Sequence, residues 1–437
     1  MKKVLIISYY WPPSGGVGAQ RWLKMSKYLP ENGWEPVIFT PENPDFNIKD
    51  ESGLRDIGPR TEVIKLPIWE PYQLFNSVKG KSNKQNLKQG LVLENNKQSW
   101  LDKLSIWLRG NLLIPDPKRF WIRPAVKFLE GIVKSNKIDL IITTGPPHSM
   151  HMIGQRLKGK TGLPWIADFR DPWSKWDLLD KLKTSAVVKN IHIKLEKKVL
   201  VQADAVLTVS YRLANALEEV RGSKVEVLHN GYDEQDEVFT EHIKPEKFIV
   251  SHTGLLNEMR NPIYLWEAME ELCEENKDFE HSLDVRLGGI ISESIISDIE
   301  EYKNLKNKIS IVEYLPHDKI YEEYSKASIL LLLLNNTNNS KWILPSKLFE
   351  YIHVGKPILM LGELESDASD IVQKFEGNFV VDFKNKDAIK NAILKNYQSY
   401  KEGQDYRNQC AHANDYSRRE LTKQLVKVMN RITSIDN

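Results

Sequence analysis

Short apolar runs alternate with longer amphipathic stretches along the first 230 residues of the chain. Such runs are typical of strands buried in a parallel sheet, and the stretches between them suit helices. The predicted strands are residues 4–8, 36–40, 62–66, 139–144, 163–168, 204–210 and 225–228. This pattern predicts an α/β unit of the Rossmann type.

The alternation starts again after a charged linker at 233–246. The predicted strands are now 248–254, 285–289, 309–315, 328–334 and 357–362, and the predicted helices are 262–276, 292–304, 317–326 and 345–354. We therefore predict an α/β fold of two Rossmann-like domains that face each other across a cleft. The predicted domains are 1–232 and 247–404, and a helical tail, 405–437, is expected to pack back on the body.

Composition and charge narrow the class of protein. The 61 basic residues are almost balanced by 59 acidic ones, which argues against a dedicated nucleic-acid binder. Cys273 and Cys410 are far apart and form neither a disulfide framework nor a metal site. The apolar run near the N-terminus is too short for a signal peptide, and Ile329–Leu334 is too short to span a membrane. A cytoplasmic location is expected.

Residues 69–128 depart from the alternation and form a basic and aromatic insertion. An apolar stripe at helical spacing runs through Trp100, Leu104, Trp107 and Leu108. Such a stripe suits a helix lying in a membrane interface, so residues 100–114 are a candidate membrane contact. The same stripe would also suit a helix that packs on the protein as a lid.

The segment LPSKLFEYIHVGKPILML, residues 344–361, is the most informative motif. Pro345 suits a helix start and Gly355 a helix end, and Lys347 and Glu350 fall on one face between them. The helix N-terminus suits a phosphate, and Glu350 could accept hydrogen bonds from ribose hydroxyls. An ordinary surface helix with a Lys/Glu pair would show the same spacing.

A glycine pair, Gly15 and Gly16, follows the first predicted strand. These glycines would let the backbone approach an anion at the start of the next helix, although a tight turn would also use them. Arg21 stands where a dinucleotide-binding fingerprint would have its third glycine, so the segment does not match that motif.

Polar residues also follow the fourth and fifth predicted strands. TTGPPHSMH brings His148 and His151, and ADFRDPW brings Asp168, Arg170 and Asp171. Both segments lie at the ligand-binding edge of the predicted sheet, where an imidazole or carboxylate could bind or deprotonate an acceptor hydroxyl. An Asp/Arg pair that braces a loop is the alternative.

In the second half, Arg260 lies just before a helix that is predicted to begin at Pro262. A fixed guanidinium there could reach a diphosphate, and a surface arginine is the alternative.

Taken together, the motifs PPSGG, TTGPPHS, ADFRDPW, LHNGYD, HTGLLNEMRNP and LPSKLFEYIHVGKPIL resemble those of GT-B fold glycosyltransferases, closest to retaining family 4. The resemblance covers nearly the whole chain. It implies a retaining transfer of a sugar from a nucleotide sugar to a hydroxyl of a lipid-linked or polysaccharide acceptor. It also suggests bacterial surface-polysaccharide biosynthesis, with peripheral attachment at the inner face of the plasma membrane.

The resemblance also implies roles for individual residues. Lys347 and Arg260 would lie at the diphosphate of a UDP- or GDP-sugar and Glu350 on its ribose. The donor set would be completed by Ser346, Gly15 and Gly16. Catalysis would involve Asp168, His148, Arg260 and Lys347, and the acceptor would meet His148, Asp168, Arg170 and Asp171. Neither a metal nor a further cofactor is expected.

The sequence departs from the family pattern at several positions. Trp342 stands where the family has the first of two glutamates eight residues apart, and Leu255 and Asn261 stand where it has a basic pair. The histidine often found after the fifth strand is replaced by residues 168–171. Two alternatives therefore stay open: a nucleotide-sugar 2-epimerase of the same fold, and an inactive protein that binds sugar nucleotides.

Overall fold

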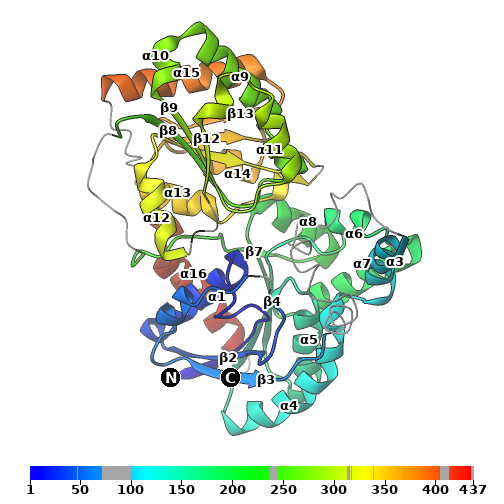
Figure 1. Cartoon of the computed structure of the whole chain (residues 1–437). Helices are drawn as coiled ribbons and strands as arrows, with labels where there is room; N and C mark the ends of the chain where they lie inside the picture. Colours follow the sequence, from blue (N-terminus) through cyan, green and yellow to red (C-terminus); the bar gives the residue numbers. More distant parts are fainter. Residues whose placement is uncertain are drawn as a thin grey trace. The chain divides into compact units, whose positions relative to one another are not determined.

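The chain folds into two compact units in a computed structural model. The structure describes residues 1–46, 48–70, 100–236, 245–312, 315, 317–337, 339–403 and 413–434. The N-terminal unit is Met1–Asn230 with Arg418–Asn437, and the C-terminal unit is Gly231–Ser417. Each unit is an α/β body around one parallel sheet (Figure 1).

The sheet of the N-terminal unit has the order β3-β2-β1-β4-β5-β6-β7, with all neighbours parallel. Its strands are β1 (Lys2–Ile7), β2 (Trp34–Pro41), β3 (Glu62–Leu66), β4 (Leu140–Gly145), β5 (Trp165–Phe169), β6 (Ala205–Thr208) and β7 (Glu226–Val227). The chain order reverses between β1 and β4. The loops that follow these two strands therefore flank the crevice where open parallel sheets bind ligands.

The helices of this unit are α1 (Val17–Tyr28), α3 (Trp100–Leu112), α4 (Ile122–Ser135), α5 (Ser149–Thr161), α6 (Asp177–Lys181), α7 (Ala186–Gln202), α8 (Tyr211–Arg221) and α16 (Arg418–Thr433). The last helix packs on the first, as the red and blue ribbons of Figure 1 show. Leu425 and Met429 are fully buried in one core cluster with Trp22 and Leu29, which explains the apolar stripe of this otherwise polar tail.

The sheet of the C-terminal unit has the order β10-β9-β8-β11-β12-β13, again parallel throughout. Its strands are β8 (Phe248–Thr253), β9 (Leu283–Gly288), β10 (Ile309–Val312), β11 (Ile329–Leu333), β12 (Ile358–Leu361) and β13 (Phe379–Val381). The order reverses between β8 and β11. Strand β11, ILLLL, is buried along its whole length, as expected of a central parallel strand.

The helices of this unit are α9 (Ile263–Glu275), α10 (Lys277–Ser282), α11 (Glu293–Glu300), α12 (His317–Lys326), α13 (Lys347–Val354), α14 (Asp367–Val372) and α15 (Lys386–Glu402). Short 3-10 turns complete the two units: η1 (Pro30–Asn32), η2 (Ser52–Asp56), η4 (Pro117–Trp121), η5 (Glu258–Arg260), η6 (Leu305–Lys308), η7 (Ser340–Trp342) and η8 (Ala413–Tyr416). Within the described part of the chain, no helix has both the length and the apolar composition that crossing a bilayer requires.

The predicted fold class is confirmed: the chain has two parallel-sheet α/β units, and its C-terminal helix packs back on the body. The helix predicted around Trp100 also forms, as α3. The side chains of residues 100–105, which carry the first half of its apolar stripe, lie outside the described residues. The lysine-rich segment 71–99 and Cys410 also lie outside them.

Candidate active site

Helix α13 brings the most informative motif to the reversal point of the second sheet. It begins at Lys347, directly after Pro345 and Ser346, and ends at Val354. Gly355 follows with φ 73°, and its N–H donates to the carbonyl of Tyr351, which closes the helix in the left-handed conformation that glycine favours. The observed helix starts two residues after the predicted one.

The Lys347 side chain reaches from α13 to the end of β8. Its Nζ donates a hydrogen bond to the backbone carbonyl of Thr253. Gly254 follows with φ 127°, and a Cβ at this position would collide with the Lys347 ammonium group. Gly289 packs behind it, where a Cβ would lie 2.7 Å from the Gly254 carbonyl oxygen. Glycines at both positions therefore allow the amine to approach this backbone.

The surroundings of Lys347 favour the neutral form of its amine. Burial lowers the pKa of Lys347 to about 7, and the charge of Arg260 acts in the same direction, while Glu350 opposes both. A buried amine with this pKa gains from a nearby anion, because an anion stabilises its protonated form.

Arg260 joins the loops that follow β8 and β11. It ends the turn η5, and its Nε donates to Oδ1 of Asn335, while Nη1 donates to the carbonyl of Leu255 at 3.2 Å. The guanidinium is half-buried, and burial lowers the pKa of Arg260 below its usual value. The structure thus places two cationic side chains, Arg260 and Lys347, at the reversal point of one sheet.

Glu350 lies one turn into α13 and is held by a tyrosine. The Tyr324 hydroxyl donates to Oε2 of Glu350 at 3.2 Å, and it also lies 2.7 Å from Oγ1 of Thr253. Burial, followed by the charge of Glu350, raises the pKa of Tyr324 well above its usual value, so this phenol stays protonated. The contact connects α12, α13 and β8 and fixes the position of the carboxylate.

Two further residues precede α13. Ser346 occupies the N-cap position, is half-buried, and makes no side-chain capping hydrogen bond. Trp342, which stands at the family's first glutamate position, ends η7 and is half-buried. Its indole cannot provide the carboxylate that the family pattern has there.

The glycine pair of the N-terminal unit lies in the loop between β1 and α1. The Gly15 N–H donates to the carbonyl of Ile48 at 3.0 Å, so this donor braces the loop. Gly16 is the N-cap of α1, with φ 81°. An anion at this loop would therefore have to meet the first-turn N–H groups of α1, and the donor-binding roles of Gly15 and Gly16 stay predictions.

Asp168 is fully buried in a bidentate ion pair with Arg21, with distances of 3.0 and 3.1 Å. Trp22 Nε1 and the Thr144 hydroxyl donate to the same carboxylate, at 2.8 and 2.9 Å. Burial alone would raise the pKa of Asp168, but Arg21, with smaller contributions from Arg170 and Trp22, lowers the pKa overall. These contacts favour a structural role, and the predicted catalytic and acceptor-binding roles of Asp168 stay predictions.

Arg21 itself was not identified as a site residue from the sequence. Besides Asp168, its guanidinium binds the carbonyls of Leu228 and His229, each at 2.9 Å. Its position in place of a fingerprint glycine is the one sequence signal at Arg21. Its partner Asp168 lies 147 residues away, so local spacing does not predict the pair.

Arg170 connects the first turn of α1 with the end of β4. Its guanidinium donates to the carbonyls of Gly18, Gly145 and Pro146 at 2.9, 3.2 and 2.6 Å. This geometry fits the loop-bracing alternative. Asp171 is exposed beside it, and its role in acceptor binding stays a prediction.

The two predicted histidines lie at the start of α5. The His148 ring is buried and stacks on Trp173 with centroids 4.6 Å apart, and neither ring nitrogen has a hydrogen-bond partner among the described residues. His151 Nδ1 lies 2.9 Å from the Thr143 hydroxyl. Burial lowers the pKa of His148 well below its usual value and that of His151 to about 3, so both rings are neutral at pH 7.

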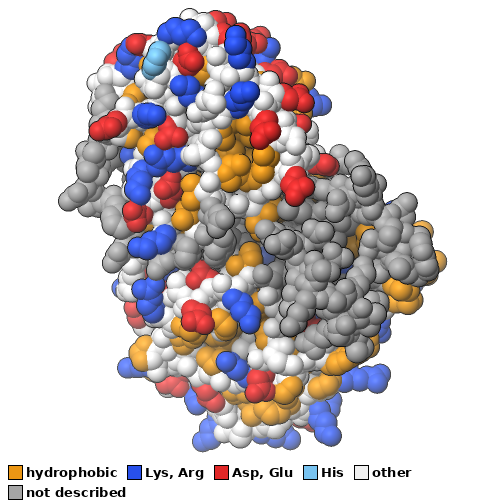
Figure 2. All heavy atoms as spheres, in the orientation of Figure 1, with side chains coloured by type: hydrophobic (Ala, Val, Ile, Leu, Met, Phe, Trp, Pro, Cys, Tyr) orange, Lys and Arg blue, Asp and Glu red, His pale blue; other side chains and the backbone are white. Residues whose placement is uncertain are grey.

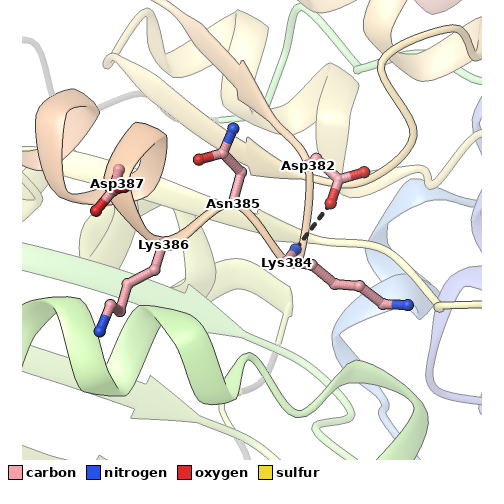
Figure 3. Close-up of a pocket in the computed structure, with 5 residues that line it drawn as sticks. All are labelled: Asp382, Lys384, Asn385, Lys386 and Asp387. Atoms are coloured by element: carbon pink, nitrogen blue, oxygen red, sulfur yellow. Dashed lines mark hydrogen bonds between the residues drawn. The ribbon is translucent and has the colours of Figure 1, made fainter.

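A surface depression between β13 and α15 does not belong to this site. Figure 3 shows its lining residues, Asp382, Lys384, Asn385, Lys386 and Asp387. Lys386 extends away toward α9, where its Nζ lies 2.6 Å from Glu271. The face drawn in Figure 2 shows basic and acidic side chains interspersed, in keeping with the nearly balanced net charge of +2.

Comparison with known proteins identifies the class of this chain. The model of Glycosyltransferase Family 4 matches residues 96–236, and that of Glycosyl transferases group 1 matches residues 233–413. No curated protein sequence matches the chain significantly.

Solved structures share the fold over nearly the whole chain. Sucrose-phosphate synthase from Thermosynechococcus elongatus is 14% identical, with a TM-score of 0.65 and coverage of 99% of this chain and 100% of that one. HepE from Anabaena, in complex with UDP-glucose, is 13% identical, with a TM-score of 0.62 and coverage of 99% and 100%. TarM from S. aureus, in a complex that contains UDP, is 10% identical, with a TM-score of 0.62 and coverage of 98% and 100%.

The two family models together match residues 96–413, which include parts of both units. The first model matches part of the unit that contains the first sheet. The second model matches the unit that contains the second sheet and Lys347. The chain is a family-4-like glycosyltransferase of the GT-B fold.

Proposed function

We propose that the protein is a retaining glycosyltransferase that uses a UDP- or GDP-sugar donor, and that its C-terminal unit binds the donor. The observation that carries the proposal is the position of Lys347, Arg260 and Glu350 around the ends of β8 and β11. Open α/β sheets bind ligands at this reversal point. HepE and TarM, which share the fold, are known in complexes with UDP-glucose and UDP.

Each group has a chemical task in this proposal. Lys347 and Arg260 bind the diphosphate, and Ser346 assists at the N-terminus of α13. Glu350, fixed by Tyr324, accepts hydrogen bonds from the ribose hydroxyls. The proposal needs no metal ion, because the two cations and the helix N-terminus stabilise the charge of the leaving diphosphate.

In the proposed reaction the bond between the sugar's anomeric carbon and the diphosphate oxygen breaks while the acceptor oxygen bonds to the same carbon from the same face. The proton of the acceptor hydroxyl passes to the leaving phosphate oxygen, so no enzyme base is consumed. We assign the acceptor, a lipid-linked or polysaccharide hydroxyl in surface-polysaccharide synthesis, by family resemblance.

The test is an assay of purified protein with radiolabelled UDP- and GDP-sugars, with and without a bacterial lipid-linked oligosaccharide extract. The proposal predicts release of nucleoside diphosphate and transfer of label only when the acceptor is present. A new nucleotide sugar formed without acceptor would identify an epimerase. Tight binding of a donor without any turnover would identify an inactive binding protein.

A further inference from the structure

Three aromatic side chains gather at one edge of the N-terminal sheet. Tyr9 and Tyr10 follow β1 and Phe46 follows β2, so these parallel neighbours bring the rings to the same edge. Tyr10 and Phe46 are stacked, with ring centroids 6.3 Å apart and ring planes at 27°. The Tyr9 ring meets both of them edge-on, at 4.9 and 5.8 Å. Tyr9 is buried, whereas Tyr10 and Phe46 are half-buried and keep part of their surface open to solvent.

Polar contacts fix the position of the buried Tyr9. Its hydroxyl donates to Oε1 of Glu70 at 2.9 Å, and Glu70 is fully buried. The other oxygen of Glu70 accepts the backbone N–H of Asp45, one residue before Phe46, at 2.7 Å. The Lys118 ammonium group binds the same carboxylate and lies 4.4 Å from the centre of the Tyr9 ring. One carboxylate therefore fixes both the tyrosine and the backbone that carries Phe46.

The Tyr10 ring packs against the start of α1. A Cβ at Gly18, in the first turn of this helix, would lie 3.0 Å from the Tyr10 ring. Arg170 donates to the carbonyl of Gly18 and connects the same turn with the end of β4. The rings therefore lie beside the reversal point between β1 and β4, where open parallel sheets bind ligands.

The cations that adjoin these rings already have partners. Lys118 binds the buried Glu70, and the Arg170 guanidinium binds three backbone carbonyls. A phosphate at the rings would have to displace a buried carboxylate or these carbonyls, which is costly. A sugar ring needs no such exchange, because its C–H groups can be buried against an aromatic face while its hydroxyls stay in contact with water.

We propose that Tyr10 and Phe46 form a stacking surface for a sugar ring of the acceptor, so that the acceptor is a saccharide and not a bare lipid or polyol phosphate. The inference rests on the proposed transfer reaction and names the class of its second substrate. The exposed carboxylate of Asp45, next to Phe46, can accept hydrogen bonds from the sugar hydroxyls. Because Tyr9 and Gly18 already hold the two rings in place, binding requires little further ordering of the protein.

Saturation-transfer NMR of the full chain with lipid-free oligosaccharides tests this proposal. The oligosaccharides are released by mild acid from the bacterial lipid-linked extract, and glycerol 3-phosphate is the non-sugar probe. We expect saturation to reach the C–H protons of the sugar rings and not those of glycerol 3-phosphate. Tyr10→Leu and Phe46→Leu should each raise the apparent dissociation constant of the oligosaccharides on the order of tenfold, through the loss of an aromatic contact.

Two control variants separate stacking from other effects. Tyr10→Phe keeps the ring without its hydroxyl and should bind oligosaccharides as the wild type does. Phe128→Leu removes an exposed ring of α4, which stacks on Phe39 with centroids 6.1 Å apart, and should also leave this binding unchanged. Wild-type protein that transfers no saturation to sugar protons, or a Tyr10→Phe variant as weak as Tyr10→Leu, would overturn the proposal.

Nucleotide binding and sugar transfer keep this proposal separate from the proposed function. Tyr10→Leu should be stabilised by a nucleoside diphosphate as much as the wild type, which also shows that the variant is folded. Sugar transfer by the wild type, with undiminished saccharide binding in Tyr10→Leu, would refute the stacking surface alone. Saccharide binding that depends on both rings, without transfer to any acceptor, would refute the proposed reaction and support the saccharide site.

Discussion

Lys347 donates a hydrogen bond to the backbone carbonyl of Thr253, which lies 94 residues earlier in the chain. This contact places the α13 amine at the end of β8, beside Arg260 and opposite Gly254. In the proposed complex, this amine exchanges the carbonyl for a phosphate oxygen of the donor. The consequences can be measured.

Binding of a nucleoside diphosphate should cause the protein to take up a proton at alkaline pH. The pKa of Lys347 is lowered to about 7, so much of the amine is neutral at pH 8 in the free protein, and a bound diphosphate favours its charged form. Above pH 7, affinity should fall by up to about tenfold per pH unit. Calorimetry in buffers of different ionisation enthalpy should detect close to one proton taken up at pH 8 and almost none at pH 6. Equal uptake at both pH values would contradict this assignment.

The variant Gly254→Ala should weaken nucleotide binding beyond its effect on folding. Its Cβ would displace the Lys347 ammonium group, and φ 127° is strained for alanine. Gly162→Ala is the matched control, because Gly162 also has positive φ, 74°, but its Cβ would meet no atom within 4 Å. We expect both variants to lose about 1–2 kcal/mol of folding free energy. Only Gly254→Ala should raise the dissociation constant, and equal dissociation constants for the two variants would show that the approach of Lys347 does not matter.

Breaking the buried Arg21–Asp168 pair should destabilise the N-terminal unit. Asp168→Ala leaves a buried guanidinium without its main partner, at an expected cost of about 3–5 kcal/mol in the free energy of unfolding. Asp180→Ala removes an exposed aspartate that pairs with Lys189 and should leave the urea midpoint almost unchanged. Urea denaturation followed by fluorescence compares the two. A stable Asp168→Ala protein would reopen a direct role for this carboxylate in acceptor binding.

Arg170→Lys should lower the rate of sugar transfer while leaving nucleotide affinity unchanged. Lysine cannot bridge the carbonyls of Gly18, Gly145 and Pro146 at once, so the start of α1 and the end of β4 lose their common hydrogen-bond partner. Misplacement of segments that line the reacting groups can cost up to about a hundredfold in rate. The readouts are kcat for transfer and the dissociation constant of the nucleotide. Arg156→Ala, an exposed position on α5, is the control. A changed dissociation constant with unchanged kcat would assign Arg170 to the donor.

Apolar runs were sufficient to predict most of the two sheets, because a strand buried on both faces cannot be polar. Strand β13 was missed because Phe379–Val381 has three residues and is only partly buried. The Lys347 helix was predicted from its end signals, Pro345 and Gly355. By contrast, the partners of Arg21, Arg170 and Lys347 depend on which strands become neighbours. Such pairings across the sheet cannot be derived from local spacing.

The central claim is that α13 binds the nucleotide of the donor. The most direct test measures how much each nucleotide stabilises the wild type, Glu350→Ala and Glu376→Ala against unfolding. UDP, GDP, ADP and CMP are compared, with the exposed Glu376 as the matched control in the same unit. We predict that one nucleoside diphosphate at about 100 times its dissociation constant adds about 2.7 kcal/mol of stability to the wild type and to Glu376→Ala. Glu350→Ala should bind it about 10- to 100-fold more weakly, through the lost hydrogen bonds to a charged group. No stabilisation by any nucleotide, or equal stabilisation of Glu350→Ala, would contradict the account.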